Sequence, residues 1–459
     1  MDIARELVRC LCKVKFEDLP TDLVEVTKKE ILDALATGVG GSSAPGIREV
    51  VDIVKDWGGK EESTILVYGG KVPAPDAVLA NAPMMHALDF DDTHDGAVLH
   101  PAVVAVPTAL AVAEARGGIS GRDLITAVAL GVDLGCRMRI ATKLRKPNLH
   151  AAGGWHSTPL YGFFMAAAIA GRIMGLDEEK ALNALGIAYH QAAGNVQCID
   201  DGALTKRIGP GFAARGGIVA ALMAEKGISG AHNIIEGECG FYNLYHDGFD
   251  LDKLTSRLGE YFKGVNISFK PYPCCRIGHR YIDAVLDMVS RYNIKLEEVE
   301  EVEVVAGNKS QTPWQPLEVK RKPRTIVDAQ FSLPWMIACA IVRRRVGVQE
   351  FTQEAIMDPT LLKVAQLVKP VYDFSFEETL DSPMDVTIKT KRGEFNRKTV
   401  APYGHPNNPL SLEAIASKLR DCASIAARPI LSANLERVIE LVRNLEIMPN
   451  VTQIMKLLS

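Results

Sequence analysis

The residues best suited to chemistry gather in one stretch, His86–Pro101, which reads HALDFDDTHDGAVLHP. It contains four aspartates and three histidines, namely Asp89, Asp91, Asp92, Asp95, His86, His94 and His100. Mostly apolar segments lie on both sides, and the second of them, Ala102–Ala113, has no charge. Titratable groups in such surroundings are costly to desolvate unless they are paired, bind a ligand or line a cavity. We interpret the stretch as one wall of an active site; a solvated acidic loop between helices is the alternative.

Three other segments place polar side chains in apolar surroundings. His156 lies in GGWHSTPLYG ahead of a buried helix, where Ser157 or Thr158 as a plain N-cap is the alternative. A helix start there would also favour a bound anion. Lys206 and Arg207 precede an alanine-rich helix, where exposed, solvated charge is the alternative.

The third segment, Phe269–His279, reads FKPYPCCRIGH. Its prolines argue against a helix and predict a stiff, extended turn. Such a turn can carry Lys270 and His279 to a cleft between domains, or it can be a plain linker. The adjacent cysteines at 274 and 275 are poorly spaced to chelate one metal ion.

Together these segments supply a set of basic groups in a chain of net charge −4: His94, His100, His156, Lys206, Lys270 and His279. The combination suits a small polycarboxylate, because cations hold its carboxylates while histidines or a carboxylate move a proton. A rate that weakens at high pH is expected as lysines and histidines lose charge. The chain contains neither a phosphate-cradling GxxxxGK[ST] motif nor a strand followed by GxGxxG.

Helices are predicted to position most of these residues. Apolar residues at three- and four-residue spacing predict helices in 3–35, with a turn near Pro20, and again at Ile47–Trp57. Ser63–Tyr68 is predicted as a short β excursion and Pro75–His86 as a helix. Short helices follow to Gly240, with breaks expected at Gly117-Gly118, Gly153-Gly154, Gly175, Gly209 and Gly227.

The pattern changes near Val265. Val299–Gly307 and Met384–Arg392 alternate like strands, and the latter forms a predicted hairpin with Glu394–Val400. Helices are expected at Ile282–Tyr292, Pro334–Val346, Thr352–Val368, Leu412–Ala426 and Leu431–Leu445. The predicted fold is therefore mainly α: an all-helical domain built from both chain ends (1–265 and 401–459) plus an inserted α+β lid domain (266–400).

The bulk composition fits this organisation. A chain of 459 residues with 47% hydrophobic and 24% charged residues is typical of a soluble protein of two domains. The small net charge gives no general attraction to nucleic acid or to an anionic membrane, and apolar runs are too short to span one. The start of the chain lacks a signal-peptide pattern. Nine scattered cysteines are typical of reduced thiols, so a cytoplasmic location is expected.

The motifs together resemble the MmgE/PrpD family, which contains 2-methylcitrate dehydratase, cis-aconitate decarboxylase and iminodisuccinate epimerase. The resemblance rests on seven motifs in order: FEDLP…ILD, HALDFDDTH…HP, GWHST, TKR…GFAA, KPYPCCRIGH, DAQFSLPW and GHPNNPLS. It implies a homodimer that needs neither metal nor organic cofactor. It also implies an active-site cleft between the helical domain and the lid.

By this resemblance the cis-aconitate decarboxylase site corresponds to Asp89, Thr93, His100, His156, Lys206 and Lys270. The two lysines would pair with substrate carboxylates, while His100 and His156, with Asp89, would move protons at the carbon next to a carboxylate. Thr93, His94 and His279 are expected to bind substrate. The chain departs from many members at Ala102 and at Ile208–Gly211, both close to the inferred pocket.

The first choice is a cofactor-independent lyase that dehydrates a 2-methylcitrate-like acid. Decarboxylation of cis-aconitate type, or epimerisation of a substituted succinate, comes next. A metal-dependent hydrolase that uses the Asp89–His100 cluster is an alternative from another class. A non-catalytic helical scaffold or acid-binding sensor is a further one.

Overall fold

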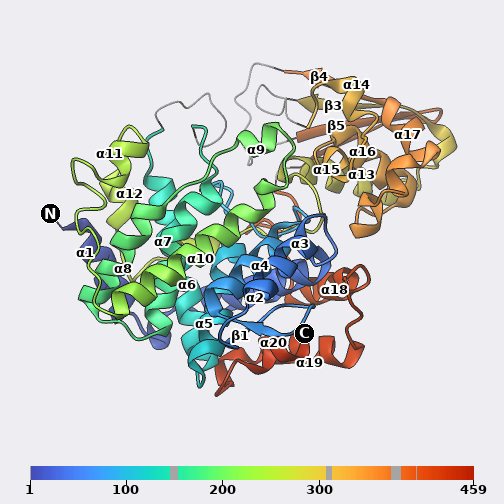
Figure 1. The fold of residues 1–459 in the computed structure, drawn as a ribbon. Helices are drawn as coiled ribbons and strands as arrows, with labels where there is room; N and C mark the ends of the chain where they lie inside the picture. Colours follow the sequence, from blue (N-terminus) through green and yellow to red (C-terminus); the bar gives the residue numbers. More distant parts are fainter. Residues whose placement is uncertain (1, 145–152, 307–312, 374–383, 400) are drawn as a thin grey trace. The chain divides into compact units, whose positions relative to one another are not determined.

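The computed structural model describes residues 2–144, 153–306, 313–373, 384–399 and 401–459 (Figure 1). The chain separates into two compact units. The first comprises Met1–Ser268 and Ser411–Ser459, and the second comprises Phe269–Leu410. Helices dominate and the strands are few, which confirms the mainly α fold class.

The first unit is a helical assembly with one two-stranded ribbon. Its longer helices are α1 (Ile3–Lys13), α2 (Thr21–Gly41), α3 (Ile47–Trp57), α4 (Ala74–His86), α5 (Ala102–Arg116), α6 (Gly121–Ala141), α7 (Ser157–Ile173), α8 (Glu178–Gln191), α10 (Thr205–Glu225), α18 (Leu412–Ala423) and α19 (Ser432–Arg443). Its shorter helices are α9 (Gln197–Asp200), α11 (Phe241–Tyr245), α12 (Leu251–Thr255) and α20 (Gln453–Leu457). The ribbon pairs β1 (Ser63–Thr64) with β2 (Lys71–Val72) in antiparallel fashion, so the predicted β excursion is confirmed only over its first residues.

The interior of this unit is built from helices that are apolar nearly all round. In α5 every residue from Ala102 to Ala113 is buried, as the absence of charge there predicts. Small residues let such helices approach closely: a Cβ atom added to Gly211 of α10 would lie 3.0 Å from the Leu79 carbonyl oxygen of α4. This tight packing brings the ends of α4, α7 and α10 toward one region.

Most predicted helix breaks are confirmed, and one is wrong. The chain leaves helix at Gly117-Gly118, Gly153-Gly154, Gly175 and Gly227, but α10 continues through Gly209 and Pro210. The packing of α10 against α4 outweighs the weak local helix propensity of this glycine–proline segment. The prediction that Lys206 precedes the helix is also wrong. Helix α10 begins at Thr205, so Lys206 lies in its first turn.

The second unit contains a four-stranded sheet in the order β4-β3-β5-β6. The strands are β3 (Val299–Ala306), β4 (Val368–Tyr372), β5 (Met384–Thr390) and β6 (Gly393–Thr399). Strands β3 and β4 are parallel, and the other two pairs are antiparallel. Helices α13 (His279–Arg291), α14 (Leu317–Lys320), α15 (Ile326–Gln330), α16 (Leu333–Arg343) and α17 (Pro359–Gln366) complete it.

The predicted hairpin is confirmed, because Thr390 pairs with Gly393 across a two-residue turn. Its last predicted residue, Val400, and the end of the preceding strand at Gly307 lie outside the described residues. The predicted helix Thr352–Val368 is only partly right, since α17 ends at Gln366 and β4 follows at once. Strand β4 contains Pro370, which is tolerated because β4 is an edge strand.

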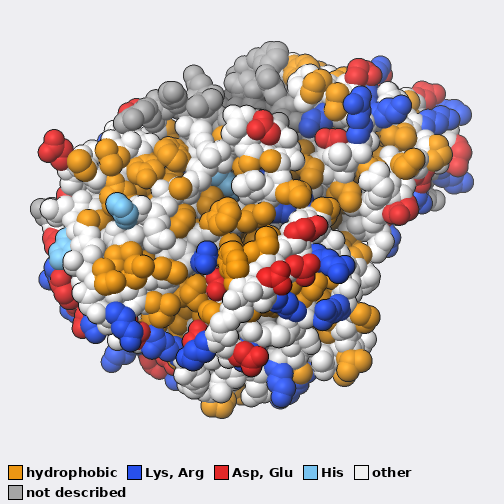
Figure 2. Space-filling view, in the orientation of Figure 1, with side chains coloured by type: hydrophobic (Ala, Val, Ile, Leu, Met, Phe, Trp, Pro, Cys, Tyr) orange, Lys and Arg blue, Asp and Glu red, His pale blue; other side chains and the backbone are white. Residues whose placement is uncertain are grey.

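Short 3₁₀ turns link several of these elements, at Phe16–Asp18, Lys263–Asn266, Arg276–Gly278, Leu296–Glu298, Val348–Phe351, Ala355–Met357 and Leu445–Ile447. Within the described parts of the chain, none of the helices combines the length and apolarity needed to cross a membrane. Figure 2 shows hydrophobic side chains gathered over the region of α4 and α10. Two large side chains of α10, Phe212 and Met223, are 50% and 40% exposed.

Candidate active site

The loop from Ala87 to Pro101 joins α4 to α5 and carries most of the candidate residues. Its backbone is fixed at two points. Thr93 exchanges backbone hydrogen bonds of 2.8 and 2.7 Å with Ser268, and the His94 N–H donates to the Leu99 carbonyl over 2.8 Å. Asp89 has a φ of +51°, in the left-handed region that aspartate tolerates better than most residues. The acidic stretch is therefore folded inward as a fixed loop, and the solvated-loop alternative is wrong.

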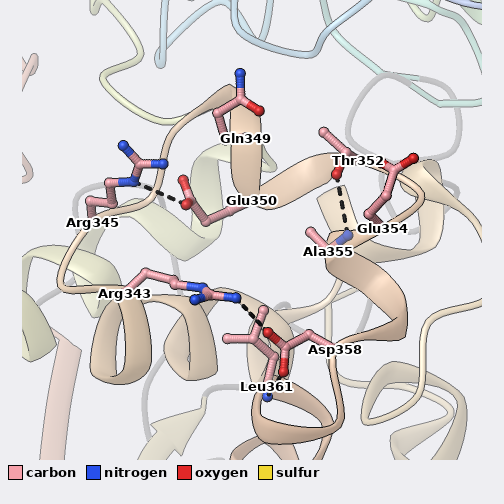
Figure 3. A pocket seen from close by; sticks show the side chains of 9 residues that line it. All are labelled: Arg343, Arg345, Gln349, Glu350, Thr352, Glu354, Ala355, Asp358 and Leu361. Atoms are coloured by element: carbon pink, nitrogen blue, oxygen red, sulfur yellow. Dashed lines mark hydrogen bonds and ion pairs between the residues drawn. The ribbon is translucent and has the colours of Figure 1, made fainter.

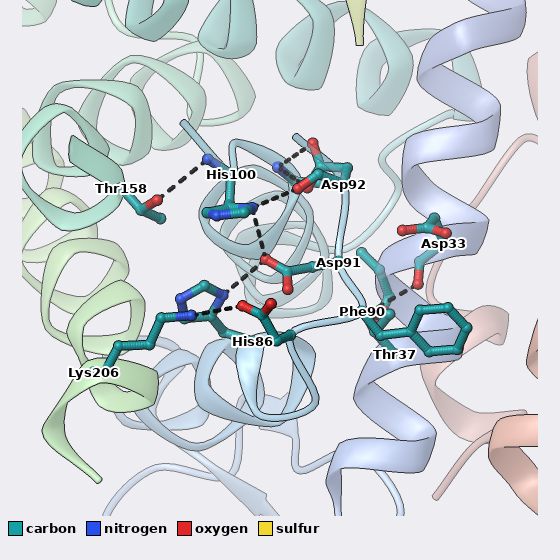
Figure 4. Close-up of polar contacts among 12 residues, drawn as sticks. Asp33, Thr37, His86, Phe90, Asp91, Asp92, His100, Thr158 and Lys206 are labelled. Carbon is teal, nitrogen blue, oxygen red and sulfur yellow. Dashed lines mark hydrogen bonds and ion pairs between the residues drawn. The ribbon is translucent and has the colours of Figure 1, made fainter. Parts of the chain in front are cut away.

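At the centre of the loop, the Asp91 carboxylate lies close to two histidines (Figure 4). The Asp91 Oδ2 atom lies 2.7 Å from Nδ1 of His86 and 3.4 Å from Nδ1 of His100. The Asp91 side chain is 1% exposed, whereas that of His100 is 21% exposed. Asp91 and His86 thus form a supporting layer behind His100, which has the more accessible imidazole.

The backbone also decides which nitrogen of His100 carries the proton. Nδ1 of His100 lies 2.7 Å from the Asp92 carbonyl oxygen. A carbonyl only accepts hydrogen bonds, so we infer that Nδ1 is the protonated nitrogen and donates. In the neutral ring Nε2 is then the basic nitrogen, the one that can take or return a proton. The His100 N–H, held by the Thr158 hydroxyl at 3.2 Å, fixes the same residue from α7.

His156 and Lys206 approach this cluster from two other helices. His156 is the N-cap residue of α7, so the alternative in which Ser157 or Thr158 caps this helix is wrong. The His156 ring stacks on that of His86, with centroids 6.0 Å apart. The Nζ atom of Lys206 donates to Asp89 Oδ1 over 3.0 Å, so the expectation of a solvated lysine is wrong as well.

The segment that carries His156 is held by its own neighbours. The His156 N–H donates to the Gly194 carbonyl over 3.3 Å, and the Val196 N–H donates to the Gly154 carbonyl over 3.2 Å. Gly194 has a φ of +143°, and an added Cβ would lie 2.7 Å from Pro159. A side chain at this position would therefore displace the start of α7 and with it His156.

Burial sets the protonation of two of these histidines. Desolvation lowers the pKa of His86, and the nearby Lys206 adds to the effect against the pull of Asp91. Burial lowers the pKa of His156 well below its ordinary value, and the neighbouring His86 and Lys206 act in the same direction. Both rings are thus neutral at pH 7.

A second layer of buried acids lies behind the loop. The carboxylate of Asp92 accepts the Ala102 N–H over 3.2 Å at the start of α5. Burial raises the pKa of Asp92 well above its ordinary value, and the nearby Glu30 adds to this. Burial likewise raises the pKa of Glu30 well above its ordinary value, with Asp33 as a second cause. Burial therefore favours the protonated, neutral form of both carboxyl groups.

One buried cation compensates this layer from the far end of the chain. Lys418 of α18 donates to Asp33 Oδ1 over 2.7 Å and to the Phe90 carbonyl over 2.6 Å. Its Nζ also lies 3.8 Å from the centroid of the Phe90 ring. Helix α18 thereby holds in place the loop that carries Asp89 and Asp91. Removing the charge of Lys418 would destabilise the fold, because a buried ion pair would lose one of its two members.

The structure brings together Asp89, His100, His156 and Lys206 of the predicted catalytic residues. Thr93 and His94 lie in the same loop, where the Nδ1 atom of His94 accepts the Ala97 N–H over 3.1 Å. Lys270 and His279 belong to the second unit. Lys270 is the second residue of that unit, and His279 is the first residue of α13. Their part in binding substrate, like that of Thr93 and His94, stays a prediction.

Four residues of this arrangement were not among the predicted site residues: His86, Asp91, Thr158 and Lys418. His86 and Asp91 lay within the singled-out stretch, and only their mutual hydrogen bond distinguishes them. No sequence signal connects Lys418 to Asp33, because the two are 385 residues apart.

The metal-hydrolase alternative gains no support from the donor geometry. Within the described ranges, no group of three or more His, Cys, Asp and Glu side chains converges so as to hold a metal ion. Asp91 of the loop and His86 at the end of α4 are instead hydrogen-bonded to each other.

The second unit has a pocket of its own, lined by residues that include Arg343 and Arg345 (Figure 3). Arg343 pairs with Asp358, and Arg345 pairs with Glu350 at 3.0 Å. Both arginines are thus already engaged with carboxylates, which makes the pocket a weaker candidate for an anionic substrate than the histidine cluster.

Comparison with known families and proteins agrees with the geometry. The MmgE/PrpD N-terminal domain matches residues 5–254, and the MmgE/PrpD C-terminal domain matches residues 272–446. The chain therefore belongs to the MmgE/PrpD family.

Among individual relatives, the cis-aconitate decarboxylase-like protein oryM of Aspergillus oryzae is 25% identical, with 100% of this chain and 97% of that protein aligned. The cis-aconitate decarboxylase of Aspergillus terreus is also 25% identical, over 100% of this chain and 96% of its own length. The cis-aconitate decarboxylase of Homo sapiens is 25% identical over 94% and 89%, respectively. The family and these relatives together support an enzyme of the lyase class.

Proposed function

We propose that this protein is a cofactor-independent lyase that transfers a proton at a carbon next to a carboxylate of a small tricarboxylate, with decarboxylation of cis-aconitate type as its reaction. The observation that carries the proposal is the fixed His100 imidazole. Its Nδ1 donates to a carbonyl, which makes Nε2 the basic nitrogen of the neutral ring, and Asp91 Oδ2 lies 3.4 Å from Nδ1. Relatives named as cis-aconitate decarboxylases, aligned along nearly the whole chain, support this choice of reaction.

In such a reaction the carbon–carbon bond to one carboxylate breaks and carbon dioxide leaves. The electron pair moves through the double bond to a carbon next to a remaining carboxylate, and a proton is added there. One proton is consumed for each molecule of carbon dioxide released. Cations placed against the remaining carboxylates stabilise the negative charge that develops at this stage.

Each clustered residue has a role suited to this chemistry. His100 delivers or removes the proton, and the Asp91 carboxylate stabilises its charged form. Lys206, 20% exposed at its side chain, pairs with a substrate carboxylate while Asp89 holds it in position. His156, a neutral ring beside the cluster, is a second proton-transfer group. Lys270 is proposed as a further carboxylate partner, with Thr93, His94 and His279 as substrate contacts.

The first choice from sequence, dehydration of a 2-methylcitrate-like acid, gains no support from the relatives. Dehydration and decarboxylation nevertheless use the same apparatus, since both develop charge next to a carboxylate. They differ in products: decarboxylation releases carbon dioxide and consumes a proton, whereas dehydration releases water and keeps every carboxylate.

The test is a screen of the purified protein against cis-aconitate, 2-methylcitrate, citrate and substituted succinates, with products identified by NMR. We expect turnover of cis-aconitate, and loss of that turnover in His156→Gln and Lys206→Ala with the fold intact. Turnover of 2-methylcitrate alone would replace decarboxylation with dehydration. Activity abolished by a chelator and restored by a divalent metal would instead favour a metal-dependent enzyme.

We also propose that the protein works as a homodimer. The resemblance to the family implied a dimer, and the exposed apolar side chains of Phe212 and Met223 on α10 offer a surface that association would bury. Sedimentation equilibrium would show two copies for the wild-type chain. A monomeric wild-type chain would contradict the proposal.

A further inference from the structure

We infer that His86 is a positioning residue that, together with Asp91, holds the imidazoles of His100 and His156 in their working arrangement. The inference rests on the proposed function and extends it to a side chain that touches no substrate. His86 is the last residue of α4, and its side chain is fully covered. It therefore acts through its neighbours.

The ring of His86 lies beside those of both proton-transfer histidines. Its ring centroid is 5.3 Å from that of His100, in a tilted arrangement, and 6.0 Å from that of His156, in a stacked one. The two rings arrive from the loop before α5 and from the start of α7, and His86 is in contact distance of both. A change in the His86 ring would shift both reactive rings at once.

The hydrogen bond to Asp91 fixes the ring of His86. The 2.7 Å contact from His86 Nδ1 reaches the same Oδ2 atom that stands 3.4 Å from His100 Nδ1. By donating to this oxygen, His86 orients the Asp91 carboxylate toward His100. So oriented, the Asp91 carboxylate acts together with the Asp92 carbonyl, which lies 2.7 Å from the same His100 nitrogen, to hold the Nδ1-protonated tautomer of His100.

The Nε2 atom of His86 shows that filling buried space is not enough to account for a histidine at this position. Its Nε2 atom is buried and finds no hydrogen-bond partner within the described part of the chain. Buried polar atoms are normally bonded, and an apolar ring would fill the same space without an unpartnered nitrogen. The Asp91 contact is therefore the feature of His86 that an apolar side chain lacks.

The charges around His86 explain why its neutral form matters. The titratable groups that act on it are Asp89 and Asp91 on the loop, His100 and His156 beside its ring, and Lys206 from α10. A positive charge on His86 would oppose protonation of His100 and His156. A neutral His86 supplies a hydrogen bond to Asp91 without that repulsion.

The test compares two substitutions that separate the hydrogen bond from the filled space. His86→Phe keeps a stacked ring but donates nothing to Asp91, whereas the amide of His86→Asn reaches the Nδ1 position and can donate. We expect His86→Phe to lower kcat for cis-aconitate by about 100-fold with KM changed less than threefold, in the range of one misaligned proton-transfer group. His86→Asn should recover at least a tenth of the wild-type kcat.

A second readout needs no substrate. Side-chain ¹⁵N NMR of the histidines should show His100 protonated at Nδ1 in the wild type and a mixture of tautomers in His86→Phe. His246→Phe, at another buried histidine that contacts the Tyr161 hydroxyl at 3.2 Å, is the matched control and should leave the His100 signals unchanged. Melting curves establish that each variant is folded.

The outcomes are distinct. An unchanged kcat and an unchanged His100 tautomer in folded His86→Phe would overturn the inference. An equal loss in His86→Asn and His86→Phe would do the same, because filled space and not the hydrogen bond would then be decisive. If the wild type converts none of the acids but the tautomer shift occurs, the positioning role holds and the proposed function fails.

Discussion

Replacing Asp91 with asparagine should remove most of the activity while it preserves the fold. Asp91 stands 3.4 Å from His100 Nδ1, so at an effective dielectric constant of about 20 it stabilises a protonated His100 by about 5 kcal/mol. The His100 side chain is 21% exposed, so water replaces part of this attraction. We therefore expect a loss of about 3–4 kcal/mol, or about 10²- to 10³-fold in kcat.

The asparagine oxygen can still accept the hydrogen bond from His86, so the variant should fold. The assay is the initial rate of cis-aconitate consumption followed by NMR, with the folded fraction taken from thermal melting. Asp252→Asn, an exposed aspartate of the same unit, is the matched control and should keep wild-type activity. A folded Asp91→Asn protein within threefold of the wild-type kcat would refute the electrostatic role assigned to this carboxylate.

Four further predictions concern activity, stability and pH. Lys206→Ala should lower kcat for cis-aconitate by about 10²–10³-fold, as for other groups that stabilise developing charge, and a rate close to wild type would remove it from the mechanism. Lys418→Met should lower the free energy of unfolding, measured by urea denaturation, by about 3–5 kcal/mol, because the buried Asp33 loses its ion-pair partner. Adding Asp33→Asn should recover much of that loss, and additive losses would contradict the pairing. Glu30 has a pKa raised in the folded state, so above pH 4.5 the unfolded chain releases a proton that the folded chain keeps, and stability falls as pH rises toward the folded pKa. Glu30→Gln should remove that slope of about 1.4 kcal/mol per pH unit, and an unchanged slope would argue against a protonated Glu30. His156 has a pKa lowered in the folded state, so below pH 6.5 the unfolded chain binds more protons and stability falls with acidification. His156→Gln should flatten the stability curve on this acid side, and an equally steep curve would mean that His156 is charged in the folded protein.

Much of the fold follows from local patterns in the sequence. The helix Ile47–Trp57 is observed over the residues that its apolar spacing predicts, and the buried α5 follows from a run without charge. Strand β5 shows alternating burial, and the predicted hairpin follows it, with Gly393 as the first residue of β6. These features depend on residues close together in the chain, which is why they can be read from it.

The errors have a common cause in packing between distant segments. A glycine–proline–glycine segment predicts a break, yet α10 continues because it packs against α4. Strand β4 was not predicted, and it pairs with β3, which lies more than sixty residues earlier in the chain. Local propensity is weak compared with such contacts, and the partner segment cannot be identified from the local sequence.

The candidate site shows the same division. The titratable stretch is conspicuous because its polarity contrasts with its surroundings, so its residues could be selected from sequence. The pairing of Lys206 with Asp89 joins residues 117 positions apart, and the protonation of His100 depends on a backbone carbonyl. Those relations exist only in the folded chain, and they decide which histidine nitrogen is reactive.

The most direct measurement of the central claim is the position of solvent hydrogen in the product. The purified protein is incubated with cis-aconitate in D₂O and the product is examined by NMR. Proton delivery by the fixed histidine cluster predicts one deuterium, on one face of the carbon next to a remaining carboxylate, in step with release of carbon dioxide. Deuterium distributed equally over both faces of that carbon would contradict the account.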